Sequence, residues 1–179
     1  MHEYRLGRLA GLELSTQGKA LWGSLALFAL LTAAGLAALS WPPVTALLAA
    51  LLGVALHWLS ELWHQLGHAW AARRTGYPMQ GVRFGFLGVL SSSLYPAGEP
   101  ELPASVHIRR ALGGPLASTA LAIAAALLAL ALRGTGGLPF WLAAFMAAEN
   151  LLVFGLGALL PLGFNDGSTL LHWWGRRAG

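Results

Sequence analysis

The sequence has no cysteine and very little charge. Only 10% of its 179 residues are Asp, Glu, Lys or Arg, whereas 56% are hydrophobic, and the mean hydropathy is +0.62. Without cysteine there is neither a disulfide framework nor a thiolate metal site, so a metal ion would need His, Asp or Glu as ligands. The scarcity of charge excludes a soluble domain that hides its core from water. The composition therefore predicts an integral membrane protein in a lipid bilayer.

The charge pattern argues against a nucleic-acid partner. The net charge is +4, but the basic residues stand at the ends of apolar segments and form no patch. Membrane topology explains that placement better than phosphate binding. The first apolar run begins only at Ala20, is long enough to span a bilayer and lacks a small-residue cleavage site, so we expect no cleavable signal peptide.

Four apolar segments are each long enough to cross a bilayer, which takes about 20 helical residues. Tight connections join them in pairs, at Trp41-Pro42-Pro43 and at 134–137. We therefore expect an α-helical membrane protein with four transmembrane helices and a small membrane-associated β-hairpin or sheet. The whole chain, 1–179, would form one domain, with transmembrane helices at 20–40, 44–72, 111–132 and 138–160.

The basic residues predict the orientation in the membrane. All but Arg133 lie before the first segment, between the second and third, or after the fourth. Cytosolic loops carry the excess of Lys and Arg, so we expect both termini and the long central loop to face the cytosol. The residues that carry this prediction are Arg5, Arg8, Lys19, Arg73, Arg74, Arg83, Arg109, Arg110, Arg176 and Arg177.

Two histidines four residues apart, His64 and His68, interrupt the second apolar segment. On a helix they share one face, one turn apart, so both imidazoles could bind the same metal ion. The pattern differs from the zinc-protease motif H-E-x-x-H only in Gln65, where a glutamate would act as general base. As an alternative, the two histidines could simply hydrogen-bond to a neighbouring helix.

A third ligand must come from the same depth, about 8 to 13 Å inside the cytosolic end of the second segment. The fourth segment runs toward the cytosol and breaks at Pro161, and Asp166 follows on the same side. An anionic ligand at the membrane boundary is our interpretation of Asp166. The alternative is a turn residue that caps a short helix from Ser168.

Taken together, these motifs resemble the site-2 proteases, which are intramembrane zinc metalloproteases. His64-Gln65-Leu66-Gly67-His68 is similar to the family's HELGH motif, and Ala111-Leu112-Gly113-Gly114-Pro115-Leu116-Ala117-Ser118 is similar to its central AGPLAN segment. Leu160-Pro161 through Asn165-Asp166-Gly167 resembles the C-terminal LLPxxxxDG motif. The leader at 6–14 resembles the family's N-terminal strand, so the resemblance extends over nearly the whole chain.

The resemblance implies a zinc ion held by His64, His68 and Asp166, and hydrolysis of a peptide bond within a transmembrane segment of a substrate protein. It also places the chain in a cell membrane, which we take to be prokaryotic, with the active-site side cytosolic. Two departures stand out: Gln65 at the position of the catalytic glutamate, and Asn165 directly before the aspartate.

The first departure removes the general base, which typically contributes about 10² to 10⁴ in rate. The Gln65 amide can hydrogen-bond a water but cannot accept its proton at neutral pH. We therefore expect an inactive or weakly active protease. An engineered inactive form is the first interpretation, and a natural pseudoprotease that binds transmembrane peptides without cleavage is the second. A third hypothesis is a small transporter or channel that uses the stripe of His57, Glu61, His64 and His68.

Glu61 lies one helical turn before Gln65 and could replace the missing base. We favour another role, in which Glu61 pairs with His57 or orients a ligand histidine, because a base must reach the metal-bound water. Glu149 and Asn150 in the fourth segment are expected to form helix–helix hydrogen bonds.

The stretch 81–95 is apolar but too short and glycine-rich to span, so we expect a re-entrant β element. Its exposed edge could hold an unwound substrate segment by β-addition, with Gly85, Phe86, Leu87, Gly88 and Asn165 as candidate contacts. A purely structural interfacial hairpin is the alternative. The remaining expected elements are a leader strand in 1–19 and an interfacial helix at 168–174, while the substrate and the oligomeric state stay open.

Overall fold

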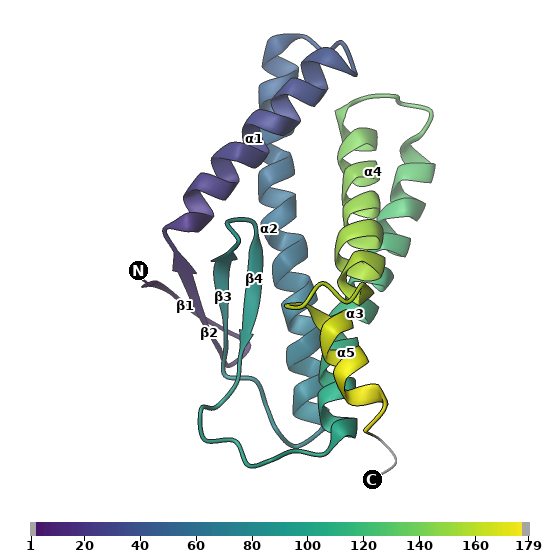
Figure 1. The fold of residues 1–179 in the computed structure, drawn as a ribbon. Helices are drawn as coiled ribbons and strands as arrows, with labels where there is room; N and C mark the ends of the chain where they lie inside the picture. Colours follow the sequence, from purple (N-terminus) through teal and green to yellow (C-terminus); the bar gives the residue numbers. More distant parts are fainter. Residues whose placement is uncertain (1–2, 177–179) are drawn as a thin grey trace.

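The computed structural model describes residues 3–176, so Met1, His2 and the end of the chain from Arg177 lie outside the described residues. Four apolar helices dominate it (Figure 1). Each is long and apolar enough to cross a membrane, which confirms the predicted class of helical membrane protein with a small sheet. The helices are α1 (Lys19–Ala37), α2 (Pro43–Arg74), α3 (Ala104–Leu132) and α4 (Leu138–Leu151), the last continued by η1 (Leu152–Leu156) and η2 (Gly157–Leu159).

The structure places the start of α3 at Ala104, seven residues before the expected boundary at 111. The expectation followed hydropathy, which falls at Arg109 and Arg110. Both arginines nevertheless lie within the helix, which begins directly after Pro103. Proline has no N–H to donate and readily stands at a helix start. The first turns of α3 are therefore polar.

The strands form one sheet in the order β1 (Glu3–Leu9), β2 (Leu12–Gln17), β3 (Gly81–Phe86) and β4 (Leu90–Leu94). The hairpin expected at 81–95 is present, but the leader contains two strands instead of one. β2 pairs in parallel with β3, so the α1–α2 hairpin is the crossover between them. The sequence has no local signal for this pairing because its partners are far apart along the chain.

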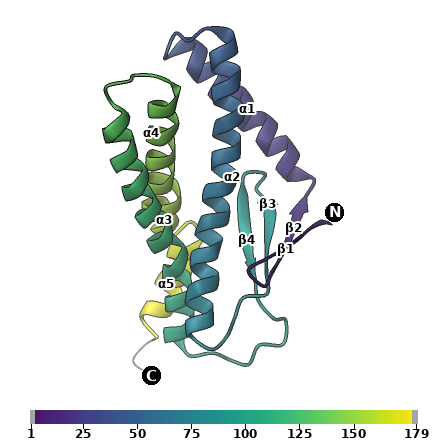
Figure 2. The same ribbon diagram turned by 180° about the vertical axis from the view of Figure 1, so that it is seen from behind.

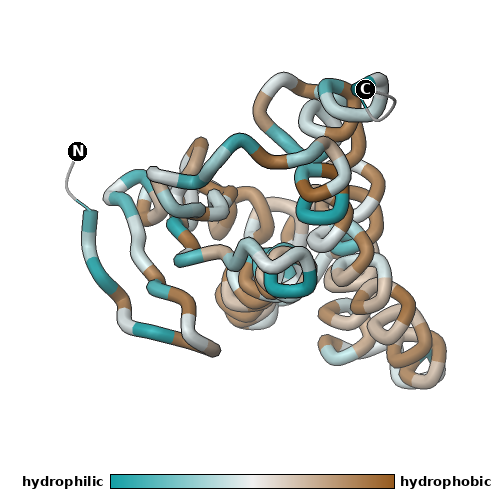
Figure 3. The backbone as a smooth tube through the Cα atoms, turned by 90° about the horizontal axis from the view of Figure 1, so that it is seen from below, coloured by the Kyte–Doolittle hydropathy of each residue, from teal (hydrophilic) through white to brown (hydrophobic). Residues whose placement is uncertain are grey.

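The sheet packs against the second half of α2, while α3 and α4 lie on the opposite side of that helix (Figure 2). The shared core is apolar and contains Ala69 and Ala72 of α2. Seen from below, the sheet forms a layer of its own beside the helices, with hydrophilic residues along its strands (Figure 3). The buried residues that the sheet side contributes to this shared core are Leu12, Met79, Val82 and Phe84.

Large apolar side chains cover much of the outer helical surface, among them Trp22, Val44 and Leu127. So large an apolar surface is unfavourable in water, whereas the hydrocarbon of a membrane accommodates it. At the opposite, inner side, α2 and α3 approach each other through two glycines. A Cβ atom at Gly67 would collide with the carbonyl oxygen of Gly113, and the reverse also holds. Small residues allow this close helix crossing.

Candidate metal centre

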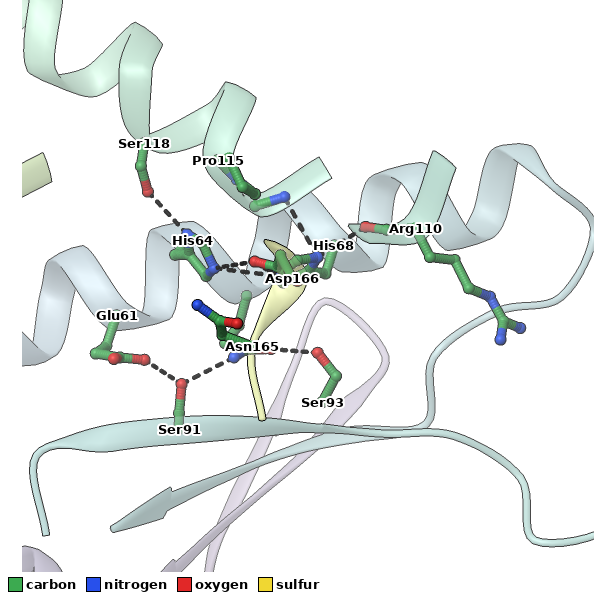
Figure 4. A network of polar contacts seen from close by, with 12 residues as sticks. Glu61, His64, His68, Ser91, Ser93, Arg110, Pro115, Ser118, Asn165 and Asp166 are labelled. Carbon is green, nitrogen blue, oxygen red and sulfur yellow. Dashed lines mark hydrogen bonds and ion pairs between the residues drawn. The ribbon is translucent and has the colours of Figure 1, made fainter. Parts of the chain in front are cut away.

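Three predicted ligands converge beside α2 (Figure 4). His64 and His68 lie on the same face of α2, with their Nε2 atoms 3.0 Å apart. Asp166 begins α5 (Asp166–Trp174), and its Oδ2 lies 3.3 Å from Nε2 of His64 and 3.4 Å from Nε2 of His68. Both histidines are buried, and the aspartate side chain is 18% exposed. Donor atoms from the second apolar segment and from the helix that follows the fourth thus meet at one point.

The donor set fits a zinc ion. A tetrahedral zinc with bonds of about 2.0 to 2.1 Å separates its ligand atoms by about 3.3 to 3.4 Å. The two His–Asp distances match that spacing, and the His–His distance of 3.0 Å is slightly shorter. Two imidazoles and one carboxylate leave a fourth position open, as in catalytic zinc sites.

The far side of each imidazole is held by α3. The Nδ1 of His68 lies 2.8 Å from the carbonyl oxygen of Arg110, and the Nδ1 of His64 lies 3.1 Å from the hydroxyl of Ser118. The Arg110 carbonyl oxygen can only accept and lies closer to Nδ1 of His68 than the amide nitrogen of Gly114 does at 3.3 Å, so Nδ1 carries the hydrogen and Nε2 presents its lone pair to the centre. Such contacts fix the tautomer and ring orientation of metal-ligating histidines. The sequence analysis did not assign these roles.

Asp166 is positioned by the turn before α5. The cap of that helix is Asn165, whose Oδ1 accepts from the N–H groups of Leu162 and Ser168. The capping role considered for Asp166 therefore falls to Asn165. Burial alone would raise the pKa of the Asp166 carboxyl, but the neighbouring His68 and His64 outweigh it and lower that pKa to about 2. The carboxylate is therefore ionised at neutral pH.

Gly114 of α3 lies directly against the two imidazoles. A Cβ atom at this position would collide with Nε2 of both His64 and His68. The glycine therefore keeps free the space into which the ligand nitrogens point. This gives the glycine–proline segment of the sequence a physical role that its motif alone did not define.

A cavity of about 840 Å³ opens at the three ligands. Of the predicted substrate contacts in the hairpin, Phe86 lines this cavity and packs on Phe164. Gly85 and Gly88 instead face α1 at the bend of the hairpin, where added Cβ atoms would crowd Ala20 and Gly23, and Leu87 is exposed beside them. Asn165 lines the cavity, as do the three serines of β4, which the sequence analysis missed: Ser91, Ser92 and Ser93.

Gln65 is buried and turned toward β4. Its Nε2 donates to the hydroxyl of Ser91 at 2.9 Å, and its Oε1 accepts from the hydroxyl of Ser93 at 2.6 Å. Both polar groups of the amide are thus paired with serines of the same strand. Gln65 also lines the cavity next to the candidate ligands.

The predicted pairing of Glu61 with His57 is wrong. His57 contacts Glu149 of α4 at 2.7 Å and the carbonyl oxygen of Val89 at 2.6 Å, whereas Glu61 accepts from the Ser91 hydroxyl. Within residues 3–176, the contacts to Nδ1 of the two ligand histidines come from α3 and not from His57 or Glu61. Periodicity placed all four residues on adjoining faces of α2 but could not show that β4 covers part of that stripe.

The expected contacts between helices are present. Besides the pair of Glu149 with His57, the amide of Asn150 donates to the hydroxyl of Ser60 at 2.8 Å. Both contacts join α4 to α2. Buried polar groups need such partners inside a membrane, where water cannot satisfy them.

No protein-family model matches the sequence, and neither does any curated protein. Among solved structures, the site-2 protease from Methanocaldococcus jannaschii matches 99% of this chain and 74% of its own length. The TM-score is 0.65 at 15% sequence identity. At this identity the match establishes the arrangement of the chain in space and not its chemistry. The chain therefore has the fold of a site-2 protease.

Proposed function

We propose that the chain is an intramembrane metallopeptidase of the site-2 protease kind, which acts on transmembrane segments of substrate proteins with impaired cleavage. The observation that carries the proposal is the convergence of His64, His68 and Asp166 beside a cavity. The shared fold with a site-2 protease supports it.

His64, His68 and Asp166 would hold a zinc ion. Zinc, when bound, would supply Lewis acidity toward a peptide carbonyl and activate water. The chain's own residues then determine what the site can do. Ser118 and the Arg110 carbonyl hold the imidazoles in place, and the buried surroundings limit access of bulk water.

Proton transfer is the weak step. The amide of Gln65 occupies the place of the general base but has no basic group, and it is engaged by Ser91 and Ser93. Cleavage slower by about 10² to 10⁴ than with a glutamate is therefore expected. This loss concerns proton transfer and requires no loss of metal or peptide binding, so non-cleaving peptide binding is the second candidate function.

The edge of the sheet offers a place for the substrate. β4 is the last strand of the described sheet, with β3 as its neighbour there, and its serines line the cavity. An unwound transmembrane segment could add to this edge through main-chain hydrogen bonds and bring a peptide bond toward the three ligands.

We further propose that the protein lies in a prokaryotic cell membrane with its site near the cytosolic face. Arg73 and Arg74 end α2 two turns beyond the ligand histidines, and Arg133 lies at the other end of the helices. The positive-inside rule then orients the chain.

The decisive first test is the metal content of the purified chain, measured without chelator for the parent, His64→Ala and Asp166→Ala. We expect nearly one zinc per chain in the parent and loss in both variants. His107→Ala is the matched control, because His107 stacks on Trp173 and is no member of the ligand group. A parent without metal under zinc supplementation would refute the proposal.

A further inference from the structure

Three polar residues of α2 bind β4 in register. His57 contacts the carbonyl of Val89, Glu61 accepts from Ser91, and Gln65 bonds to both Ser91 and Ser93. The residues on α2 are spaced by four and those on the strand by two. We call this set the α2–β4 ladder, and it consists of His57, Glu61, Gln65, Val89, Ser91 and Ser93.

The spacing explains why the ladder can form. Four residues of a helix advance about 6.0 Å, and two residues of a strand advance about 6.6 to 6.8 Å. Alternate strand residues also point to the same face, so Ser91 and Ser93 can both face α2 while Ser92 points the other way. One turn of helix thus matches two residues of the strand from Val89, directly before β4, to Ser93 within it.

The directions of the hydrogen bonds single out the residue type at position 65. Ser91 has one hydroxyl hydrogen, which it donates to the Glu61 carboxylate. Its oxygen then accepts from the Gln65 amide N–H, and the other end of that amide accepts from Ser93. Ser91 and Gln65 each donate once and accept once, and an amide at 65, unlike a carboxylate, can serve both serines.

A glutamate at position 65 would break this pattern. Its carboxylate presents acceptors only, so it would face the lone pairs of Ser91 and compete with Glu61 for one hydrogen. The side chains at positions 61 and 65 are shielded from bulk water, with Glu61 3% and Gln65 4% exposed. An unpaired acceptor is costly in such surroundings.

The contact between His57 and Val89 is supported by a second contact of the same histidine, with α4. The Val89 carbonyl can only accept, so Nε2 of His57 carries a hydrogen, and Nδ1 shares another with Glu149 of α4. The ladder therefore connects the strand through α2 to α4, the helix that leads into the turn holding Asp166.

We propose that Gln65, with Glu61 and His57, is a positioning residue that fixes the register of edge strand β4 beside the metal ligands. Gln65 then has a role of its own in positioning the site and is not merely a replacement that removes the general base. The inference deepens the proposed function, on which it rests, because it assigns the register of the strand that would hold the peptide.

Exchanging the amide and the carboxylate between positions 65 and 61 tests the ladder. Gln65→Glu alone should break the ladder. Glu61→Gln with Gln65→Glu should restore it, because the new amide can donate to Ser91 and Ser91 can then donate to the new carboxylate. Glu61→Gln alone is the matched control, since an amide oxygen at 61 still accepts from Ser91.

Because the sequence has no cysteine, a cysteine can be introduced at each chosen position and no other residue will carry a spin label. Labels at Val44 of α2 and at Leu87 in the hairpin bend, both exposed, report the position of the hairpin by their distance distribution. Along α2, Val44 lies about 20 Å before His57, so the two spin labels are far enough apart for their distance to be measured. We expect one narrow distance for the parent, Glu61→Gln and the double variant, and at least a twofold broader distribution for Gln65→Glu. Equal widths for Gln65→Glu and the parent, or a double variant as broad as Gln65→Glu, would overturn the ladder.

Peptide binding is the second measurement, and it distinguishes a positioning role of Gln65 from a purely structural one. The probe is a fluorescent transmembrane peptide of leucine and alanine with terminal lysines, titrated into unlabelled protein in bicelles. Ser91→Ala and Gln65→Glu should weaken its binding about tenfold, with binding recovered in the double variant and unchanged in Thr135→Ala, whose hydroxyl lies outside the cavity and donates to the Leu132 carbonyl. Equal affinities in all variants would refute the positioning role. A parent that binds neither zinc nor peptide would refute the proposed function, and the spin-label distances would still decide whether the ladder exists.

Discussion

The hydroxyl of Ser118 lies 3.1 Å from Nδ1 of His64, the ring nitrogen that faces away from Asp166. This contact comes from α3, and Ser118 is completely buried. The orientation of a ligand on α2 therefore depends on a neighbouring helix, and the first prediction concerns this dependence.

Ser118→Ala should lower zinc affinity about 10- to 100-fold, the usual cost of losing a residue that orients a ligand. The imidazole of His64 would no longer be held in one tautomer and ring position. Competition with a chromogenic chelator measures the affinity. Thr119→Ala on the next residue is the control, because its hydroxyl donates only to the Pro115 carbonyl of the same helix. Equal losses in both variants would point to general damage of α3.

Gly114→Ala should abolish zinc binding while much of the fold remains. The new methyl group would collide with both ligand imidazoles and push them out of the centre. Zinc content and circular dichroism, measured together, distinguish loss of the site from loss of the helices. Gly134→Ala is the control, because nothing lies within 4 Å of a Cβ there. Stoichiometric zinc in Gly114→Ala would mean that the imidazoles are placed otherwise.

The pair of His57 and Glu149 should stabilise the packing of α4 on α2. Glu149→Leu leaves Nδ1 of His57 without a partner in a buried place, and a loss of about 1 to 3 kcal/mol is expected. Glu149→Gln keeps a hydrogen bond and should cost much less. Thermal unfolding in detergent compares the two variants. A leucine variant as stable as the glutamine variant would show that the pair contributes little.

The sequence allowed the class of fold and the ligand group to be anticipated for physical reasons. Apolar runs of about 20 residues have no other stable use than to span a membrane, and histidines at i and i+4 share a helical face. Asp166 could be added because the direction of the fourth segment places it at the depth of the histidines.

The parts that the sequence could not predict depend on contacts between distant segments. Parallel pairing of β2 with β3 has no local signal, and neither does the covering of α2 by β4. For this reason Ser91 and Ser93 were read as members of an apolar hairpin, and His57 was paired with Glu61 instead of Glu149. Serines that recur at alternate positions opposite a polar helical stripe are the signal that was available.

The last prediction concerns the loop that follows β4. Glu99 accepts from both guanidinium ends of Arg110 at 2.9 and 2.5 Å, and the carbonyl of the same arginine holds His68. Hydrogen bonding from Arg110 keeps the pKa of the Glu99 carboxyl below its ordinary value of 4.5. A lowered folded-state pKa stabilises the fold above about pH 4.5, and this contribution disappears as the pH falls through the lower value.

Glu99→Gln should therefore lower stability by up to about 1.5 to 3 kcal/mol at pH 7, the range for a hydrogen bond to a charged group. The difference between parent and variant should shrink as the pH falls below 4.5 through the lowered pKa, because the parent carboxyl then becomes protonated as well. Melting temperatures in detergent at several pH values measure this convergence. Glu101→Gln, in the same loop and exposed, is the control and should remain within about 0.5 kcal/mol of the parent. A difference for Glu99→Gln that persists undiminished after the parent carboxyl has been protonated would mean that the glutamate acts through its shape and not its charge.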